Sequence, residues 1–170
     1  MQCGAGPLLD QTIMLDSLRN FISELSGGEK HPGRFEGNDY RLAAAALLIH
    51  ASTIDGDMTG AGRDKLRAVL KSHFALDDAA TAELIDIGTR AEHEAVDLYH
   101  FTSLINRSLD ERGRLGIVEM MWEIVLADGR VTEFEDNLMW RAADLLGVSS
   151  RDRIAIRHRV AGERAESGGA

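Results

Sequence analysis

The most continuous apolar pattern in the chain predicts a buried helix over residues 111–127. Beyond its first turn, the charged side chains of this stretch are Arg114, Glu119 and Glu123. A helix that is apolar on nearly every side is typical of the centre of a domain. Carboxylates on such a helix need partners, because an unpaired buried charge is energetically costly. The partners of Glu119 and Glu123 therefore bear directly on function.

The same pattern occurs a second time, 73 positions earlier (128 − 55 = 73), without a gap over residues 41–71. The positions that coincide include Asp55 with Asp128, Gly56 with Gly129 and Thr59 with Thr132. Two copies are too few for a solenoid, so we interpret the repeat as the duplication of a small helical unit. We expect the two apolar helices, residues 40–55 and 111–127, to pack together about a pseudo-twofold axis.

Helix-capping residues divide the rest of the chain into further helices. The expected helices cover residues 8–25, 40–55, 60–74, 78–93, 97–109, 111–127, 133–147 and 150–162. No stretch alternates convincingly between apolar and polar positions, so no strand is expected. The predicted fold is all-α, with seven to eight helices, built as a duplicated helical repeat around two central apolar helices.

The predicted domain organisation follows from these helices and their polar flanks. We place a single domain at residues 14–162, repeat 1 at about 40–93, repeat 2 at about 111–162, and disordered segments at 1–13 and 163–170.

Composition and charge exclude some classes of function and location. The chain has 170 residues and a net charge of −9, which argues against nucleic-acid binding and is compatible with divalent cations or basic partners. The lone Cys3 offers neither a disulfide nor a paired-cysteine metal site, which suits a reducing compartment. The longest uncharged run, residues 42–54, is too short to cross a bilayer, and the first residues lack a signal-peptide pattern. We expect a cytoplasmic protein without direct membrane insertion.

Several pieces of the chain, taken in order, resemble the tellurite-resistance TerB family over about residues 40–160. They are Leu42–His50 followed by Ile54–Gly56, the Ala95–Tyr99 junction, Glu119–Gly129, and Glu133–Asp136 followed by Ala142–Val148. The resemblance implies a duplicated all-helical fold and a cytoplasmic protein linked to tellurite and other chemical stress. It also implies protein partners, among them membrane-associated stress proteins.

The resemblance further implies that acidic residues bind a divalent metal ion. Carried over to this sequence, the acidic pattern falls on Asp55, Glu119, Asp128 and Glu135, with His50, Glu123 and Asp57 as additional candidates. Hard divalent cations take several oxygen ligands, which such a set offers. In the first repeat Gly62 replaces the acidic residue that would match Glu135, so any site is expected to be asymmetric or to rest mainly on the second repeat. The alternative is architectural, with the carboxylates only capping helices and binding turn amides.

Two other metal patterns are weaker. Asp55-Gly56-Asp57 begins like an EF-hand loop, but Leu66 stands where that motif needs a bidentate Glu, so an EF-hand is excluded. His93, Asp97 and His100 have the spacing of a two-histidine, one-carboxylate set. We expect Asp97 to begin a helix instead and both histidines to be structural or surface residues.

His50 aligns with Glu123 under the same shift. We expect these two side chains to face each other, either as a His–Glu hydrogen bond or as metal ligands.

The last helix carries a basic run, Arg151, Arg153, Arg157, His158 and Arg159. Such a run is a solvated face, or it docks on the acidic remainder of the chain or on a partner. No catalytic triad, activated cysteine or phosphate-binding loop is found. The leading hypothesis is a non-enzymatic, cytoplasmic TerB-like module that acts through protein partners and a divalent metal. The alternatives are a purely structural adaptor without metal and a metal-dependent hydrolase.

Overall fold

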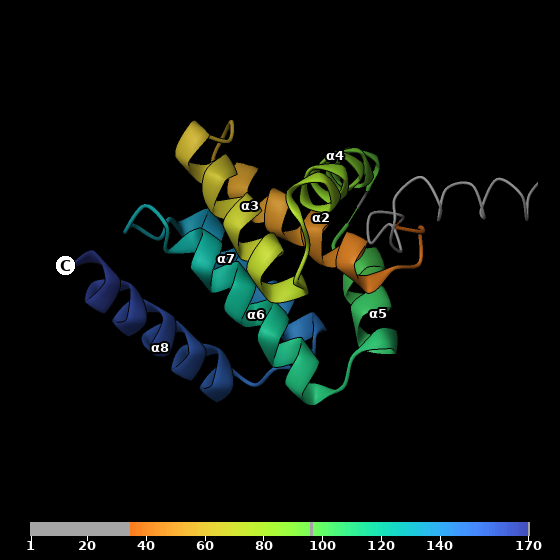
Figure 1. Ribbon diagram of the computed structural model, residues 1–170. Coiled ribbons are helices and arrows are strands. Elements are labelled where there is room, and N and C mark those ends of the chain that lie inside the picture. The colour runs from red at the N-terminus through yellow and green to blue at the C-terminus, as the bar shows by residue number, and fades with distance from the viewer. Residues whose placement is uncertain (1–34, 96, 170) are drawn as a thin grey trace, which may run out of the picture. The chain divides into compact units, whose positions relative to one another are not determined.

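Seven α-helices make up most of the part of the chain that the structure describes, a computed structural model covering residues 35–95 and 97–169. They are α2 (Tyr40–Thr53), α3 (Gly60–Phe74), α4 (Asp78–Glu94), α5 (Tyr99–Ser108), α6 (Glu111–Val125), α7 (Glu133–Leu145) and α8 (Ser150–Gly168) (Figure 1). No strand occurs in these residues, which confirms the all-α prediction. The helix expected at residues 8–25, the segment 1–13 and Cys3 lie outside the described part.

The capping residues expected from the sequence begin most of these helices. The side chains that cap a helix by accepting a backbone amide are Asp39 for α2, Thr59 for α3, Asp77 for α4, Asp110 for α6, Thr132 for α7 and Ser149 for α8. Each bond satisfies an amide that the first helical turn leaves free. Asp97 accepts from the amide of Tyr99 at 3.0 Å, so the chain breaks between α4 and α5 as expected.

The internal repeat extends over three helices in each half. The first residues of α3 and α7, Gly60 and Glu133, are related by the shift found in the sequence. Adding the same 73 positions to the residue range of α2 gives approximately the range of α6, and adding them to the range of α4 gives approximately the range of α8. Helix α5 has no counterpart and connects the two copies. The duplication is therefore a three-helix unit, longer than the gap-free similarity over residues 41–71.

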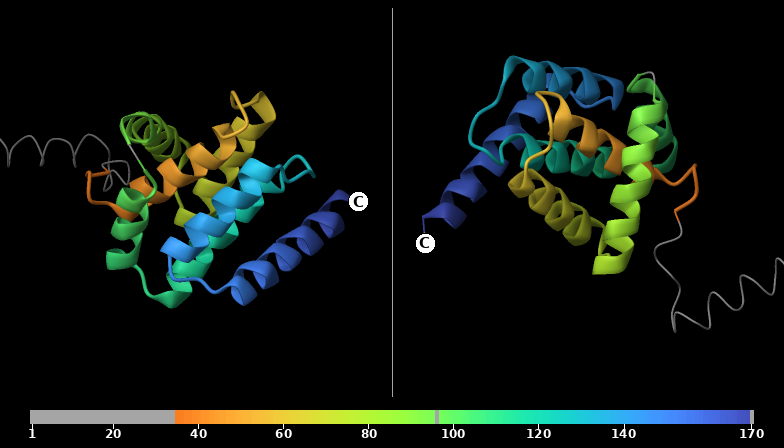
Figure 2. Two further views of the ribbon diagram at one scale, coloured as in Figure 1. Left: turned by 180° about the vertical axis from the view of Figure 1, so that it is seen from behind. Right: turned by 90° about the horizontal axis from the view of Figure 1, so that it is seen from above.

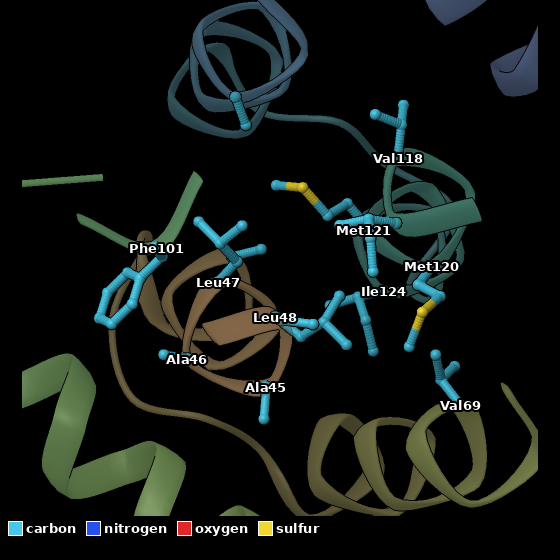
Figure 3. Packing of buried hydrophobic residues seen from close by; sticks show 14 of the residues in the cluster. Ala45, Ala46, Leu47, Leu48, Val69, Phe101, Val118, Met120, Met121 and Ile124 are labelled. Carbon is cyan, nitrogen blue, oxygen red and sulfur yellow. The ribbon is translucent and has the colours of Figure 1, made fainter. Parts of the chain in front are cut away.

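Helices α2 and α6 contact each other at the centre of the core. Helix α2 also packs against α3, α4 and α5, while α6 packs against α3, α7 and α8. Figure 3 shows Leu47 and Leu48 of α2 beside Met121 and Ile124 of α6, with Met120 directed towards Val69 of α3. Leu47, Leu48 and Met121 are fully buried. The prediction that two apolar helices form the centre is confirmed.

Small residues let α4 approach α2 closely. Four consecutive alanines of α2, residues 43–46, are at most 1% exposed. A Cβ atom added to Gly88 of α4 would lie 3.2 Å from Cβ of Ala45 and 3.0 Å from Cδ1 of Ile49. A larger side chain at Gly88 would therefore force Ala45 or Ile49 to shift.

Several helix ends differ from the sequence-based expectation, among them the end of α7 at Leu145, two residues before Gly147. Helices α2 and α6 end at Thr53 and Val125, two residues before Asp55 and Ala127, where we expected them to end. The Asp-Gly pairs therefore lie in turns. Helix α8 continues beyond Gly162 to Gly168, because Glu163–Glu166 are good helix formers and one internal glycine costs only about 1 kcal/mol.

None of the helices in the described residues combines the length and the apolar character needed to cross a membrane.

Candidate functional site

Each central helix ends in an Asp-Gly turn. Gly56 and Gly129 have φ angles of 141° and 81°, a backbone region that favours glycine because it has no Cβ atom. These turns reverse the chain directly after α2 and α6 and bring Asp55 and Asp128 to the same end of the core.

Both turns line one cleft with a volume of about 760 Å³. Its carboxylates are Asp55, Asp57, Asp64, Asp128 and Glu135, and its cations are Lys65 and Arg164. The cleft therefore joins residues of both repeats and carries an excess of negative charge. Three of the four principal metal candidates, Asp55, Asp128 and Glu135, are brought together here, with Asp57 beside them.

Thr132, an exposed residue next to this cleft, links the two repeats. Its hydroxyl donates to Asp55, with Oγ1 at 2.9 Å from Oδ1 and 3.1 Å from Oδ2. The same oxygen accepts the amide of Glu135 at 3.2 Å, and the Thr132 amide donates to Oε2 of Glu135 at 2.9 Å. This confirms the expected capping box. In the first repeat Thr59 accepts only the amide of Gly62, at 3.0 Å, because glycine has no side chain to return the bond.

Glu135 is the most buried carboxylate of the cleft, with 7% of its surface exposed. Burial raises the pKa of Glu135, and the charges of Asp55 and Asp128 raise it further. The hydrogen bonds from Thr132 act in the opposite direction but do not reverse the shift. The carboxylates of the two repeats are therefore close enough to repel one another, and a cation entering the cleft would relieve that repulsion.

Glu119 does not line this cleft. Its Oε2 lies 3.1 Å from Nη2 of Arg159 on α8, so its charge already has a partner. A second arginine of α8, Arg157, lies 3.5 Å from Asp136 of α7 and stacks over the ring of Trp122 at 5.1 Å. Part of the basic run therefore docks on the acidic remainder of the chain.

The expectation that His50 faces Glu123 was wrong. His50 Nδ1 lies 3.0 Å from Oε1 of Glu92 on α4, and Glu123 Oε1 lies 2.9 Å from Nε2 of His73 on α3. Each central helix is covered by a different neighbour at this point, so each side chain finds its partner on that neighbour. His50 and Glu123 are thus both paired outside the cleft.

Within residues 35–95 and 97–169, no three His, Cys, Asp or Glu side chains form a cluster that could hold a metal ion by themselves. Asp97 and His100 are exposed around the start of α5, and His93 is exposed near the end of α4, across the break between the two helices.

This cleft includes three charged residues that were not among the predicted site residues, Asp64, Lys65 and Arg164, and of these Arg164 contacts the turn of the second repeat. Its Nη2 donates to the backbone oxygen of Ala127, next to Asp128. The basic character of α8 was visible, but residues 163–170 were expected to be disordered. The helix-forming composition of Glu163–Glu166 was the signal that could have extended the helix to include Arg164.

The fold and the site define a class of protein: an all-helical module made of two three-helix repeats, with an acidic cleft where their Asp-Gly turns meet. The family model described as "Tellurite resistance protein TerB" matches residues 41–158, which is more than half of the chain. The chain therefore belongs to the TerB family, and the resemblance seen in the sequence is confirmed. No curated protein and no solved structure matched the chain.

Proposed function

We propose that this chain is a non-enzymatic, cytoplasmic TerB module that acts in the response to tellurite and other chemical stress by binding. The observation that carries the proposal is the cleft lined by carboxylates of both repeats, beside which Asp55 and Glu135 both accept hydrogen bonds from Thr132. Membership of the family supports the link to tellurite. A cluster of carboxylates around a capped turn offers binding chemistry, and no nucleophile paired with a base accompanies it among the cleft residues.

The ligand we propose is a hard divalent cation. The cleft offers carboxylate oxygens, which such cations prefer, and no thiolate or imidazole. Asp55, Asp128 and Glu135 would hold the ion, with Asp57 at the side. Because these side chains do not form a ready-made metal cluster, binding would require them to move closer together. The other three candidates already have partners outside the cleft. Glu119 pairs with Arg159, Glu123 with His73, and His50 with Glu92. The ion would neutralise the crowded charges and fix the two turns relative to each other.

Calorimetric titration with Ca²⁺, Mg²⁺, Mn²⁺ and Zn²⁺ tests this proposal. We expect at least one ion to bind more tightly than millimolar, and the Asp55→Asn, Asp128→Asn double variant to lose that binding. Asp144→Asn is the matched control, since Asp144 is an exposed carboxylate of α7 outside the cleft. Binding that persists unchanged in the double variant would refute the site. No binding by any ion would leave the alternative of a structural adaptor without metal.

The openness of the cleft favours a second candidate, a metal-dependent hydrolase. A volume of about 760 Å³ is within the range of small-molecule sites. Turnover of p-nitrophenyl phosphate or p-nitrophenyl acetate by the metal-loaded protein, lost in the Asp55→Asn, Asp128→Asn variant, would favour it. Absence of turnover with every ion that binds would leave the non-enzymatic module.

Protein partners, including membrane-associated stress proteins, complete the proposal. Two large aromatic side chains of α7 are exposed, Phe134 at 66% and Trp140 at 52%, and aromatic residues are enriched in protein interfaces. Crosslinking in cells compares the native chain with a Phe134→Ser, Trp140→Ser variant. An unchanged set of crosslinked proteins would exclude these two side chains as contacts to a partner.

A further inference from the structure

We propose that Arg164 is an internal cation that ties the C-terminal end of α8 to the Asp128-Gly129 turn and that a divalent cation entering the acidic cleft displaces it. The displacement step rests on the cation binding proposed above, whereas the tie is a property of the chain alone. The binding of an ion would thereby control how firmly the end of α8 is held.

The contact is direct. Nη2 of Arg164 donates to the backbone oxygen of Ala127, and both residues line the cleft. A Cβ atom at Gly129 would lie 3.7 Å from Nη1 of Arg164, so the guanidinium group covers the turn itself. Carbonyl oxygens that follow the end of a helix lack helical partners and carry partial negative charge, which makes this a favourable place for a cation.

Arg164 differs from the other arginines that fasten α8. Arg157 and Arg159 pair with the carboxylates of Asp136 and Glu119. No carboxylate lies within ion-pair distance of Arg164 in the described part of the chain. Its charge therefore contributes to the potential of the cleft without neutralising any one carboxylate. A divalent ion on Asp55, Asp128 and Glu135 would be repelled by Arg164, so the two positive charges compete for the same space.

The tie has a mechanical consequence. Val160 is the last buried residue of α8, and the residues from 161 to 169 are exposed. In the right-hand view of Figure 2 the C-terminal end of α8 extends beyond the other helices. Beyond Val160, the contact of Arg164 with Ala127 is therefore the polar bond that joins this end to the core. Loss of that bond frees the last two turns while Ile156 and Val160 still hold the first part of the helix.

Hydrogen exchange followed by mass spectrometry on the full chain tests the tie without added metal. Arg164→Gln removes the charge and weakens the bond, and Arg151→Gln removes the same charge from an exposed position at the start of α8. We expect several-fold faster exchange of residues 161–168 in Arg164→Gln and no change in Arg151→Gln. Equal exchange in the native chain and Arg164→Gln would overturn the tie.

Titration with the cation that binds most tightly, from the set Ca²⁺, Mg²⁺, Mn²⁺ and Zn²⁺, tests the displacement. Removing one like charge from a partly solvated site is expected to tighten binding by about 3- to 10-fold in Arg164→Gln. Saturating cation is expected to speed exchange of residues 161–168 in the native chain and to have no further effect in Arg164→Gln.

The outcomes separate the two proposals. If the native chain binds the cation but Arg164→Gln binds it equally and α8 does not respond, the displacement is overturned and the proposed cation site stands. If neither chain binds any cation, the proposed site is overturned together with the displacement, and the metal-free exchange still decides the tie.

Discussion

At the scale of single residues, Glu135 performs two tasks with opposing requirements. As a capping residue it accepts the amide of Thr132, and as a cleft residue it stands in the field of Asp55 and Asp128. The first task needs only an acceptor oxygen, whereas the second places a negative charge where burial and two other carboxylates disfavour it. The negative charge of Glu135 is therefore not needed for the helix cap, and it adds to the negative charge of the cleft.

We predict that Glu135→Gln preserves the fold and removes a pH-dependent loss of stability. The raised pKa means that folded Glu135 binds its proton more tightly than unfolded Glu135, whose ordinary value is 4.5. Its contribution to stability therefore falls as pH rises from 4.5 through the raised pKa. Glutamine keeps the acceptor oxygen. Urea unfolding between pH 4 and 7, compared between the two chains, should show the native chain losing stability relative to the variant.

Glu135→Ala is the control, because it removes the charge and the acceptor together. It is expected to lose about 1 kcal/mol through the cap. Parallel pH profiles of Glu135→Gln and the native chain would contradict the prediction.

The site could be predicted from the sequence only where it follows the repeat. Asp55 and Asp128 are equivalent positions at the ends of two apolar helices, so their place at one end of the core could be predicted, and the spacing of Thr132 and Glu135 predicts the capping box. Arg164 reaches the cleft from the far end of another helix. Its placement depends on how α8 lies across α6, which no local pattern encodes.

At the scale of helices, the hydrogen-bond partner of a side chain depends on which helix packs beside it. Repeat alignment paired His50 with Glu123, since both occupy the same place on their helices. The two histidine pairs instead connect α2 to α4 and α6 to α3. Because α3 packs against both central helices, the first repeat supplies the partner of a carboxylate in the second.

The pair of His73 and Glu123 is expected to make the α3–α6 contact pH-dependent. The hydrogen bond to Glu123 raises the pKa of His73 above its ordinary 6.5, despite partial burial, with a further contribution from Glu119. The stabilisation is therefore complete below pH 6.5 and is lost as pH rises through the raised pKa.

Glu123→Gln should reduce stability by about 0.5–1 kcal/mol at low pH and have little effect at high pH. Urea unfolding from pH 5.5 to 8.5 measures the difference, and His73→Asn should give the same profile. A loss in Glu123→Gln that does not vary with pH would show that the pair does not titrate as described.

Two glycines in helix interiors provide a matched test of close packing. Nothing lies within 4 Å of a Cβ atom placed on Gly116 of α6, whereas one on Gly88 of α4 would press on Ala45 and Ile49. Gly116→Ala is expected to stabilise the protein by about 0.5–1 kcal/mol through helix propensity. Gly88→Ala should lose that gain and destabilise by about 1 kcal/mol, because the backbones of α2 and α4 cannot separate easily. Thermal unfolding compares both, and equal stabilisation would rule out the tight contact.

At the scale of the whole molecule, the fold could be predicted further than the site. Helix class, capping residues and the central position of α2 and α6 all follow from apolar spacing and from short polar residues at helix starts. One departure, the extension of α8 beyond Gly162, follows from local helix propensity, whereas the partners of His50 and Glu123 are set by tertiary packing. The insertion of α5 between the copies also means that the halves are equivalent in pattern and unequal in contacts.

Thr132 offers a way to measure the bond between the repeats. Thr132→Val removes a helix cap and the hydrogen bond to Asp55, whereas Thr59→Val removes a cap alone. We expect a loss of about 1 kcal/mol for Thr59→Val and about 2 kcal/mol for Thr132→Val. The difference, measured by urea unfolding, is the contribution of the bond across the repeats. Equal losses would mean that this bond contributes nothing measurable.

The surroundings of Trp122 give the protein an optical reporter of its own. The indole is fully buried in α6, donates to the backbone oxygen of Arg153 at 3.2 Å, and lies beneath the guanidinium of Arg157. Both contacts come from α8, so the emission wavelength and quantum yield of this indole depend on whether that helix is seated. Replacing the half-exposed Trp140 by phenylalanine would leave Trp122 as the sole tryptophan, which can be excited selectively over the two tyrosines. The departure of α8 could then be followed in real time without attaching a dye.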